Sequence, residues 1–214
     1  MILYDYWRSS AACRLRIALA HLGEPYEAVP VDLLAGEQTA PDNLARNPQG
    51  LVPTLEVDGL VLTQSLAVLE YLDETRGAGF LPEDPAGRAR VRALAHAIAM
   101  DLHPICNLRV ARHAVAASAG AIAMEDWMRH FIGPGLMAVE RMLDHPMTGP
   151  FCHGDRLGLA DICLVPQVYN ARRWSVDLAP MPRIGQVMAA LEALPAVQAA
   201  HPDRWRPPRR QKAD

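Results

Sequence analysis

The chain has 214 residues, of which 50% are hydrophobic and 21% are charged, and its formal net charge at pH 7 is −3. This length and apolar content suffice for one or two packed domains, and the slightly acidic balance argues against a general nucleic-acid-binding surface. The uncharged stretch 114–124 is too short to span a bilayer, so no membrane partner is expected. The first ten residues lack a basic segment followed by an apolar one, so we expect no secretory signal and a cytoplasmic location.

The four cysteines, Cys13, Cys106, Cys152 and Cys163, form no C-x-x-C pair and have no histidine at zinc-finger spacing. In a cytoplasmic protein they are expected to be reduced thiols. Packing as small buried apolar side chains is the favoured role for all four, and no metal site is predicted.

The first 80 residues mix strand and helix patterns, with the Asp58-Gly59 pair as a strong hairpin signal. In chain order the predicted elements are a strand over 2–6, a helix ending at Gly23, a strand over 26–33, an irregular polar stretch over 35–50, two strands over 54–57 and 60–63, and a helix that Ser65 could cap and that ends just before Gly77. We therefore expect an α/β domain over residues 1–80.

A proline-containing linker over residues 81–85 precedes a second half in which only helical patterns occur. The predicted helices cover 86–117 with an interruption at Pro104, then 124–143, 159–174 and 184–194. An all-helical domain is expected over residues 86–214, and its basic tail from residue 204 is interpreted as a solvated, mobile end rather than a nucleic-acid-binding arm.

The turn between the first strand and the first helix carries two adjacent hydroxyls, Ser9 and Ser10. Backbone N–H groups and the dipole at a helix start favour an anion, and a thiolate is one such anion. Lowering a thiol pKa from about 8.5 to about 6.5 requires roughly 2.7 kcal/mol, which a dipole and one or two hydroxyl donors can supply. The alternative is that one serine only caps the helix. Cys13 is a weaker candidate for a reactive thiol, because no second cysteine lies near it.

Two further turns could hold parts of an extended ligand. A cis bond between Val52 and Pro53 would expose the Val52 backbone to an extended peptide, although cis bonds are a small minority of such bonds. Gln64 and Ser65 stand at a helix start, where a hydroxyl and free N–H groups could hold a carboxylate or simply cap the helix.

Taken together, these residues resemble the soluble glutathione transferases, in particular the zeta class. The matching stretches are WRSS and RLRIAL (7–10, 14–19), NP and LVPTL (47–48, 51–55), QSLA and EYL (64–67, 70–72), DLHPI with Asn107 (101–105), AD and LVPQV (160–161, 164–168), and ARR and VDL (171–173, 176–178). The resemblance spans nearly the whole chain and implies the glutathione transferase fold, with a thioredoxin-like glutathione-binding domain followed by an all-α substrate-binding domain.

The resemblance also implies roles for individual residues. Ser9 would donate to the glutathione thiolate with Ser10 beside it, and Val52 would pair with the glutathione backbone. The remaining glutathione contacts would come from Gln38, Gln64, Ser65, His103 and Asn107. Substrate carboxylates would be held by the guanidinium groups of Arg8, Arg109 and Arg173, which suit planar anions.

The activity implied by the resemblance is a glutathione-dependent cis–trans isomerisation of maleylacetoacetate or maleylpyruvate to the fumaryl isomer in aromatic catabolism. The thiolate would add to the cis double bond, permit rotation, and then leave, so that glutathione is a cofactor. Homodimers are usual in this family. Two alternatives are a transferase that conjugates small electrophiles and a non-catalytic glutathione-binding module.

Two positions depart from the zeta pattern. Ala11 stands where a cysteine often follows the serine pair, which puts haloacid conversion in doubt more than isomerisation. Gly158 stands where a serine or threonine usually caps the helix that contains Asp161. Because glycine at this position costs only a few tenths of a kcal/mol relative to serine, we expect the helix to form.

Overall fold

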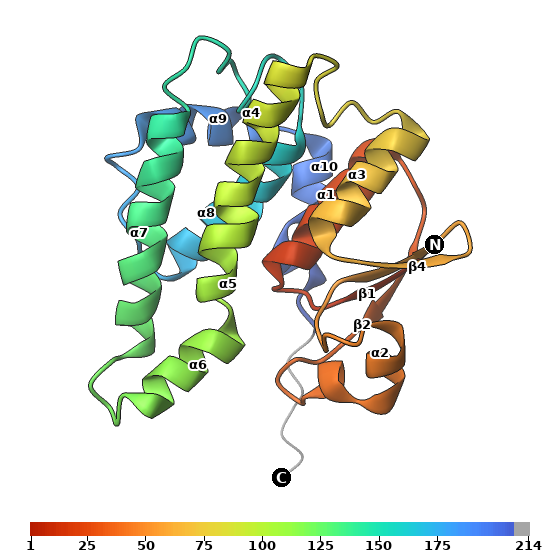
Figure 1. Ribbon diagram of the computed structural model, residues 1–214, viewed down its shortest axis with the longest axis vertical. Helices are drawn as coiled ribbons and strands as arrows, with labels where there is room; N and C mark the ends of the chain where they lie inside the picture. Colours follow the sequence, from red (N-terminus) through yellow and green to blue (C-terminus); the bar gives the residue numbers. More distant parts are fainter. Residues whose placement is uncertain (208–214) are drawn as a thin grey trace. The chain divides into compact units, whose positions relative to one another are not determined.

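A computed structural model describes residues 1–207 (Figure 1). The contacts among these residues divide them into two units. Unit 1 contains Met1–Leu72 together with the C-terminal segment from Pro195, and unit 2 contains Asp73–Leu194. The predicted glutathione-binding domain over 1–80 and substrate-binding domain over 86–214 remain a prediction. The grouping by contacts differs from these boundaries in two places: it puts residues 73–80 in the second unit and the segment from Pro195 in the first.

Unit 1 contains a four-stranded mixed sheet in the order β2-β1-β3-β4. Its strands are β1 (Ile2–Asp5), β2 (Glu27–Pro30), β3 (Thr54–Val57) and β4 (Leu60–Thr63). β1 is parallel to β2 and antiparallel to β3, and β3 is antiparallel to β4. Leu3 pairs with Leu55, and both are fully buried, so the alternating pattern of β1 does place one face in a core. The predicted hairpin is confirmed, with positive φ at Asp58 and Gly59.

The register places three chain segments at one edge of this sheet. Thr54 pairs with both Tyr4 and Thr63. The carboxyl ends of β1 and β4 and the amino end of β3 therefore meet at the same edge. The segments that continue from these strand ends carry Ser9, Val52 and Gln64.

Helices α1 (Ser10–Leu22) and α3 (Ser65–Arg76) lie on one side of the sheet, and α2 (Pro41–Arg46) lies on the other (Figure 1). α1 ends as predicted, because Gly23 adopts the left-handed conformation at φ 68° and closes the last turn. The prediction of an irregular stretch over 35–50 was wrong in part, since it contains η1 (Glu37–Thr39) and α2. Both are too short to give an apolar helical period.

The C-terminal segment of unit 1 contains α10 (Pro195–Ala200) and η3 (Pro202–Trp205), and α10 packs against α1. The fully buried Arg16 donates from Nε to the Ala200 carbonyl (3.3 Å) and from Nη2 to the Trp7 carbonyl (2.9 Å), and it pairs with Asp5 through Nη1. Together these bonds hold the C-terminal segment and the β1–α1 turn to α1.

The interpretation of the tail as solvated was wrong at its start. The Trp205 ring stacks on Tyr26 with centroids 6.1 Å apart, so the segment is held by an aromatic pair as well as by Arg16. The rest of the predicted mobile tail, residues 208–214, lies outside the described residues.

Unit 2 is helical throughout its regular structure, as predicted. Its elements are α4 (Pro85–His96), η2 (Ala97–Leu102), α5 (His103–Ile105), α6 (Leu108–Ala117), α7 (Met124–Met142), α8 (Leu159–Arg173) and α9 (Pro182–Glu192). The helix predicted over 86–117 is interrupted near Pro104, where the chain passes through the π-helical η2 and restarts at Asn107. A proline has no N–H to donate to the preceding turn, so an interruption is expected there.

α8 is the central helix of unit 2 and is buried on almost all sides over its first ten residues. It packs against α4, α7 and α9. The expectation that this helix forms despite Gly158 is confirmed, because Asp161 accepts from the Gly158 N–H at 2.9 Å and from the Cys152 N–H at 2.8 Å. A Cβ at Gly158 would stand 3.1 Å from the Phe80 carbonyl oxygen, so the glycine also permits a close backbone approach.

The loop after α7 is held by one arginine of α4. Arg90 Nη1 donates to the Cys152 carbonyl at 2.7 Å and contacts His153 Nδ1 at 3.1 Å, and Nη2 donates to Thr148 Oγ1 at 2.7 Å. Burial, and then the Arg90 charge, lower the pKa of His153 below its ordinary value. The contact with Arg90 requires a neutral ring, because only an unprotonated Nδ1 accepts a hydrogen bond.

Among residues 1–207, no helix combines the length and the hydropathy that a bilayer span requires.

Candidate functional site

The amino end of α1 is formed by the serine pair. Ser9 is the N-cap residue: its N–H donates to the Tyr6 carbonyl at 2.8 Å, and its Oγ accepts from the Ala12 N–H at 3.2 Å. The capping role considered from the sequence is therefore confirmed. A hydroxyl also carries one proton, which the cap leaves free to donate to an anion. Ser10 follows as the first helical residue.

Cys13 lies one turn further into α1 and is only 1% exposed. Burial raises the pKa of its thiol, which outweighs the opposing effect of the Arg16 charge. The thiol is therefore neutral at physiological pH, and the packing role predicted for Cys13 is confirmed. All four cysteines are buried, and none of them forms a disulfide bond.

Val52 and Pro53 are joined by a cis peptide bond, as the sequence allowed. Within residues 1–207, neither the N–H nor the C=O of Val52 has a hydrogen-bond partner. Both groups can therefore pair with an extended chain, as another strand would. Asn47 supports this turn by donating from Nδ2 to the Leu51 carbonyl at 3.0 Å.

Gln64 lies between β4 and α3 and adopts a positive φ of 66°. This conformation is unfavourable for a residue with a Cβ, and such residues are concentrated at binding sites. Its Nε2 donates to Gln49 Oε1 at 2.7 Å, which joins it to the loop that precedes Val52. The structure therefore brings Gln64 and Val52 to the same edge of the sheet.

Ser65 begins α3 and is 6% exposed. Its Oγ accepts from Arg14 Nη1 at 3.0 Å, a buried bond that joins α3 to α1. Arg14 was not among the predicted site residues, although a charged residue between Cys13 and Leu15 on a buried helix is an available signal.

Gln38 lies in η1, where its carbonyl accepts from Asn43 Nδ2 at 2.8 Å. Its side-chain Oε1 is buried and has no partner in the described residues. Within residues 1–207, no hydrogen bond joins Gln38 to the other predicted site residues, so its role at the glycyl end of glutathione stays a prediction.

Arg8 lies beside the serine pair, with its guanidinium carbon 5.2 Å from the centroid of the Trp7 ring. The guanidinium carbon of Arg206, from the C-terminal segment, lies 5.5 Å from the same centroid. Unit 1 therefore places two cations against one indole next to the amino end of α1.

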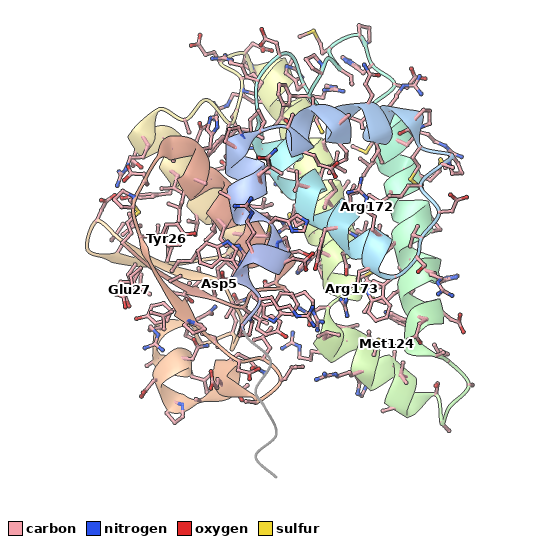
Figure 2. All side chains as sticks on the ribbon, turned by 180° about the vertical axis from the view of Figure 1, so that it is seen from behind. Asp5, Tyr26, Glu27, Met124, Arg172 and Arg173 are labelled. Atoms are coloured by element: carbon pink, nitrogen blue, oxygen red, sulfur yellow. The ribbon has the colours of Figure 1, made fainter. Side chains whose placement is uncertain are left out.

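The remaining predicted residues belong to unit 2. His103 begins α5, and Asn107 is the N-cap residue of α6, where its Oδ1 accepts from the Arg109 N–H at 2.9 Å. Arg109 is exposed in the first turn of α6. Arg173 lies beside Arg172 at the carboxyl end of α8 (Figure 2), with its guanidinium carbon 4.5 Å from the Trp174 ring centroid. The bond between Asn107 and Arg109 is a helix cap to the backbone of Arg109 and does not involve the Arg109 guanidinium.

Comparisons with known proteins agree with this arrangement. Residues 1–74 match the family model described as glutathione S-transferase, N-terminal domain. The chain is 61% identical over 208 residues to a maleylacetoacetate isomerase of Rhizobium meliloti, covering 96% of this chain and 98% of that protein.

Two solved structures resemble the whole chain. One is the holo structure of a bacterial zeta-class maleylpyruvate isomerase, with 43% identity, a TM-score of 0.90, and coverage of 94% of this chain and 97% of the other. The second is a maleylacetoacetate isomerase of Methylobacterium extorquens with bound malonate and glutathione, with 42% identity, a TM-score of 0.91, and coverage of 97% and 98%. The fold, the serine-capped first helix and this similarity over nearly the full length show that the chain belongs to the zeta-class glutathione transferase family.

Proposed function

We propose that the protein is a glutathione-dependent cis–trans isomerase that converts maleylacetoacetate or maleylpyruvate to the fumaryl isomer. The observation that carries the proposal is Ser9, whose oxygen caps α1 while its proton remains available at the positive end of the helix. The relatives named as maleylacetoacetate and maleylpyruvate isomerases support the same activity.

The residues of unit 1 fit glutathione. The unpaired backbone of Val52 suits the peptide, and the buried Ser65 with the Arg14 guanidinium behind it suits a carboxylate. Gln64 and Ser65 would hold the γ-glutamyl group, and Ser9 with Ser10 would hold the sulfur. Gln38, His103 and Asn107 are the further proposed contacts. When bound, glutathione supplies the nucleophilic sulfur that opens the cis double bond to rotation and is then released unchanged.

In the reaction, the residues of the protein stabilise the negative charges of the sulfur and of the substrate carboxylates. The Ser9 hydroxyl and the first-turn N–H groups of α1 stabilise the ionised sulfur, so that no strong protein base is needed. Arg8, Arg109 and Arg173 are the proposed partners of the substrate carboxylates. Binding both carboxylates keeps the substrate in place while the bond rotates.

We also propose that the protein acts as a cytoplasmic homodimer. The four reduced thiols are consistent with the location. The large exposed apolar side chains of Leu60, Val61 and Met100 are candidates for burial against a second copy. Light scattering during size-exclusion chromatography should give twice the chain mass, and the mass of one chain would contradict the dimer.

The deciding experiment assays both cis substrates with and without glutathione and measures glutathione throughout. Isomerisation that requires glutathione but leaves its concentration constant is the expected result. Consumption of one glutathione per turnover would instead identify a transferase that conjugates electrophiles. Glutathione binding without turnover of either substrate would identify a non-catalytic binding module. The comparison of the two substrates also determines which one the protein prefers.

A further inference from the structure

Arg14 and Arg16 are two buried arginines of α1 with opposite surroundings. Arg16 is fully buried, and each of its three guanidinium nitrogens has a partner: Asp5, Trp7 and Ala200. Arg14 is 2% exposed, and only its Nη1 is bonded, to Ser65 Oγ at 3.0 Å. Its Nε and Nη2 are buried without a hydrogen-bond partner in the described part of the chain, and no ion pair there involves Arg14.

A buried guanidinium in this state is unfavourable for the protein alone. Buried polar groups are normally hydrogen-bonded, and a buried charge without a counter-charge is among the most destabilising features a fold can contain. The positive charge of Arg14 is also poorly screened, because little water reaches it. Its position therefore needs an explanation other than the stability of the unliganded fold.

The contact with Ser65 shows where this charge acts. Because Arg14 donates to Ser65 Oγ, that oxygen serves as an acceptor, and the hydroxyl proton must be donated elsewhere. A hydroxyl that accepts from a cation becomes a stronger donor, since hydrogen bonds in a chain polarise one another. Ser65 also begins α3, so the first N–H groups of that helix share the location.

We propose that Arg14 is a positioning residue that supplies the counter-charge for the γ-glutamyl carboxylate of glutathione and directs the Ser65 hydroxyl toward it. The inference rests on the proposed function, because it assumes that glutathione binds unit 1. Arg14 acts through Ser65 and through its charge, since its own free nitrogens are buried. Binding of the carboxylate neutralises a charge that the unliganded protein leaves uncompensated.

The test measures glutathione affinity by calorimetry and thermal stability without ligand, for the wild type and the Arg14→Met variant. We expect Arg14→Met to bind glutathione about 10- to 100-fold more weakly, as for the loss of a charge-assisted interaction. We also expect the melting temperature of the unliganded variant to be equal to or above that of the wild type, because an unpaired buried charge has been removed. A purely structural arginine would give a lower melting temperature.

Three controls separate the explanations. Arg14→Lys keeps the charge and should retain more affinity than Arg14→Met. Arg16→Met removes the fully partnered arginine and should lower the melting temperature. A glutathione analogue with the γ-glutamyl α-carboxylate converted to an amide should bind weakly to the wild type and equally weakly to Arg14→Met.

Several results would overturn the proposal. Unchanged glutathione affinity in Arg14→Met, or an equal loss for glutathione and the amide analogue, would exclude a role in carboxylate binding. A lowered melting temperature with unchanged affinity would make Arg14 a structural residue. Failure of the wild type to bind glutathione would contradict the proposed function. Normal binding by the wild type together with unchanged binding by Arg14→Met would contradict only the role of Arg14.

Discussion

Replacing Ser9 by alanine removes two interactions that the structure allows to be separated. One is the cap, in which Ser9 Oγ accepts from the Ala12 N–H at 3.2 Å. Loss of such a cap costs about 1 kcal/mol of stability. The other is the proposed hydrogen bond from the Ser9 hydroxyl to the sulfur of glutathione, which is independent of the cap because the cap uses only the oxygen.

The second loss can be estimated. A hydrogen bond to a charged acceptor contributes about 1.5–3 kcal/mol. Since one pKa unit corresponds to about 1.4 kcal/mol, removing the donor should raise the pKa of the bound thiol by about 1 to 2. With a bound thiol pKa near 6.5 in the wild type, the fraction of ionised sulfur at pH 7, and with it kcat, should fall by about 3- to 25-fold, whereas the affinity for glutathione should change less.

The assay is the pH titration of thiolate absorbance in the glutathione complex, together with kcat and the unfolding free energy. Ser9→Gly is the matched control, because glycine is tolerated at an N-cap within a few tenths of a kcal/mol but carries no hydroxyl. Ser9→Gly should therefore keep the stability of the wild type and share the raised thiol pKa of Ser9→Ala. An unchanged thiol pKa in both variants, with small and equal losses of kcat and affinity, would show that Ser9 only caps the helix.

Three further predictions concern other parts of the chain. Arg173→Ala should raise KM for the acidic substrate several-fold with little change in kcat. Arg172→Ala is the control, because Arg172 pairs with Glu192, and it should leave KM unchanged. If Arg173→Ala and the wild type have the same KM in steady-state assays, Arg173 does not belong to the substrate site. Because the pKa of His153 is lowered in the folded state, the unfolded chain binds more protons as the pH falls below about 6.5, and stability is lost there. His153→Asn keeps an acceptor for the guanidinium and should weaken this dependence in urea unfolding at pH 5 to 7; an identical pH profile would refute the assignment. Asp5→Ala leaves the buried Arg16 charge uncompensated and should destabilise the protein by about 3–5 kcal/mol in urea unfolding, and a loss below about 1 kcal/mol would contradict the pairing.

Elements with local signals were predicted well. The end of α1 at Gly23, the hairpin at Asp58-Gly59 and the start of α3 at Ser65 each depend on residues adjacent in the chain. The same holds for the N-cap at Ser9, because a cap is formed within four residues. The candidate residues of unit 1 could therefore be named from the sequence with the help of the family resemblance.

Elements stabilised by distant contacts were missed or misread. α2 and α10 have six residues each, too few to show a period. The tail was interpreted as solvated because its composition is basic, yet Trp205 stacks on Tyr26, nearly 180 positions earlier in the sequence. No local pattern contains the information that two such segments meet.

The two arginines of α1 show which properties follow from the sequence alone and which depend on the tertiary structure. Residues 10–22 determine by themselves that a helix forms, where it is capped and that Arg14 and Arg16 lie on it. Only the folded chain decides that Arg16 meets Asp5 and Ala200, whereas Arg14 meets Ser65 alone. The physical reason is that helix formation depends on neighbouring residues, whereas the state of a buried charge depends on every group that excludes water from it.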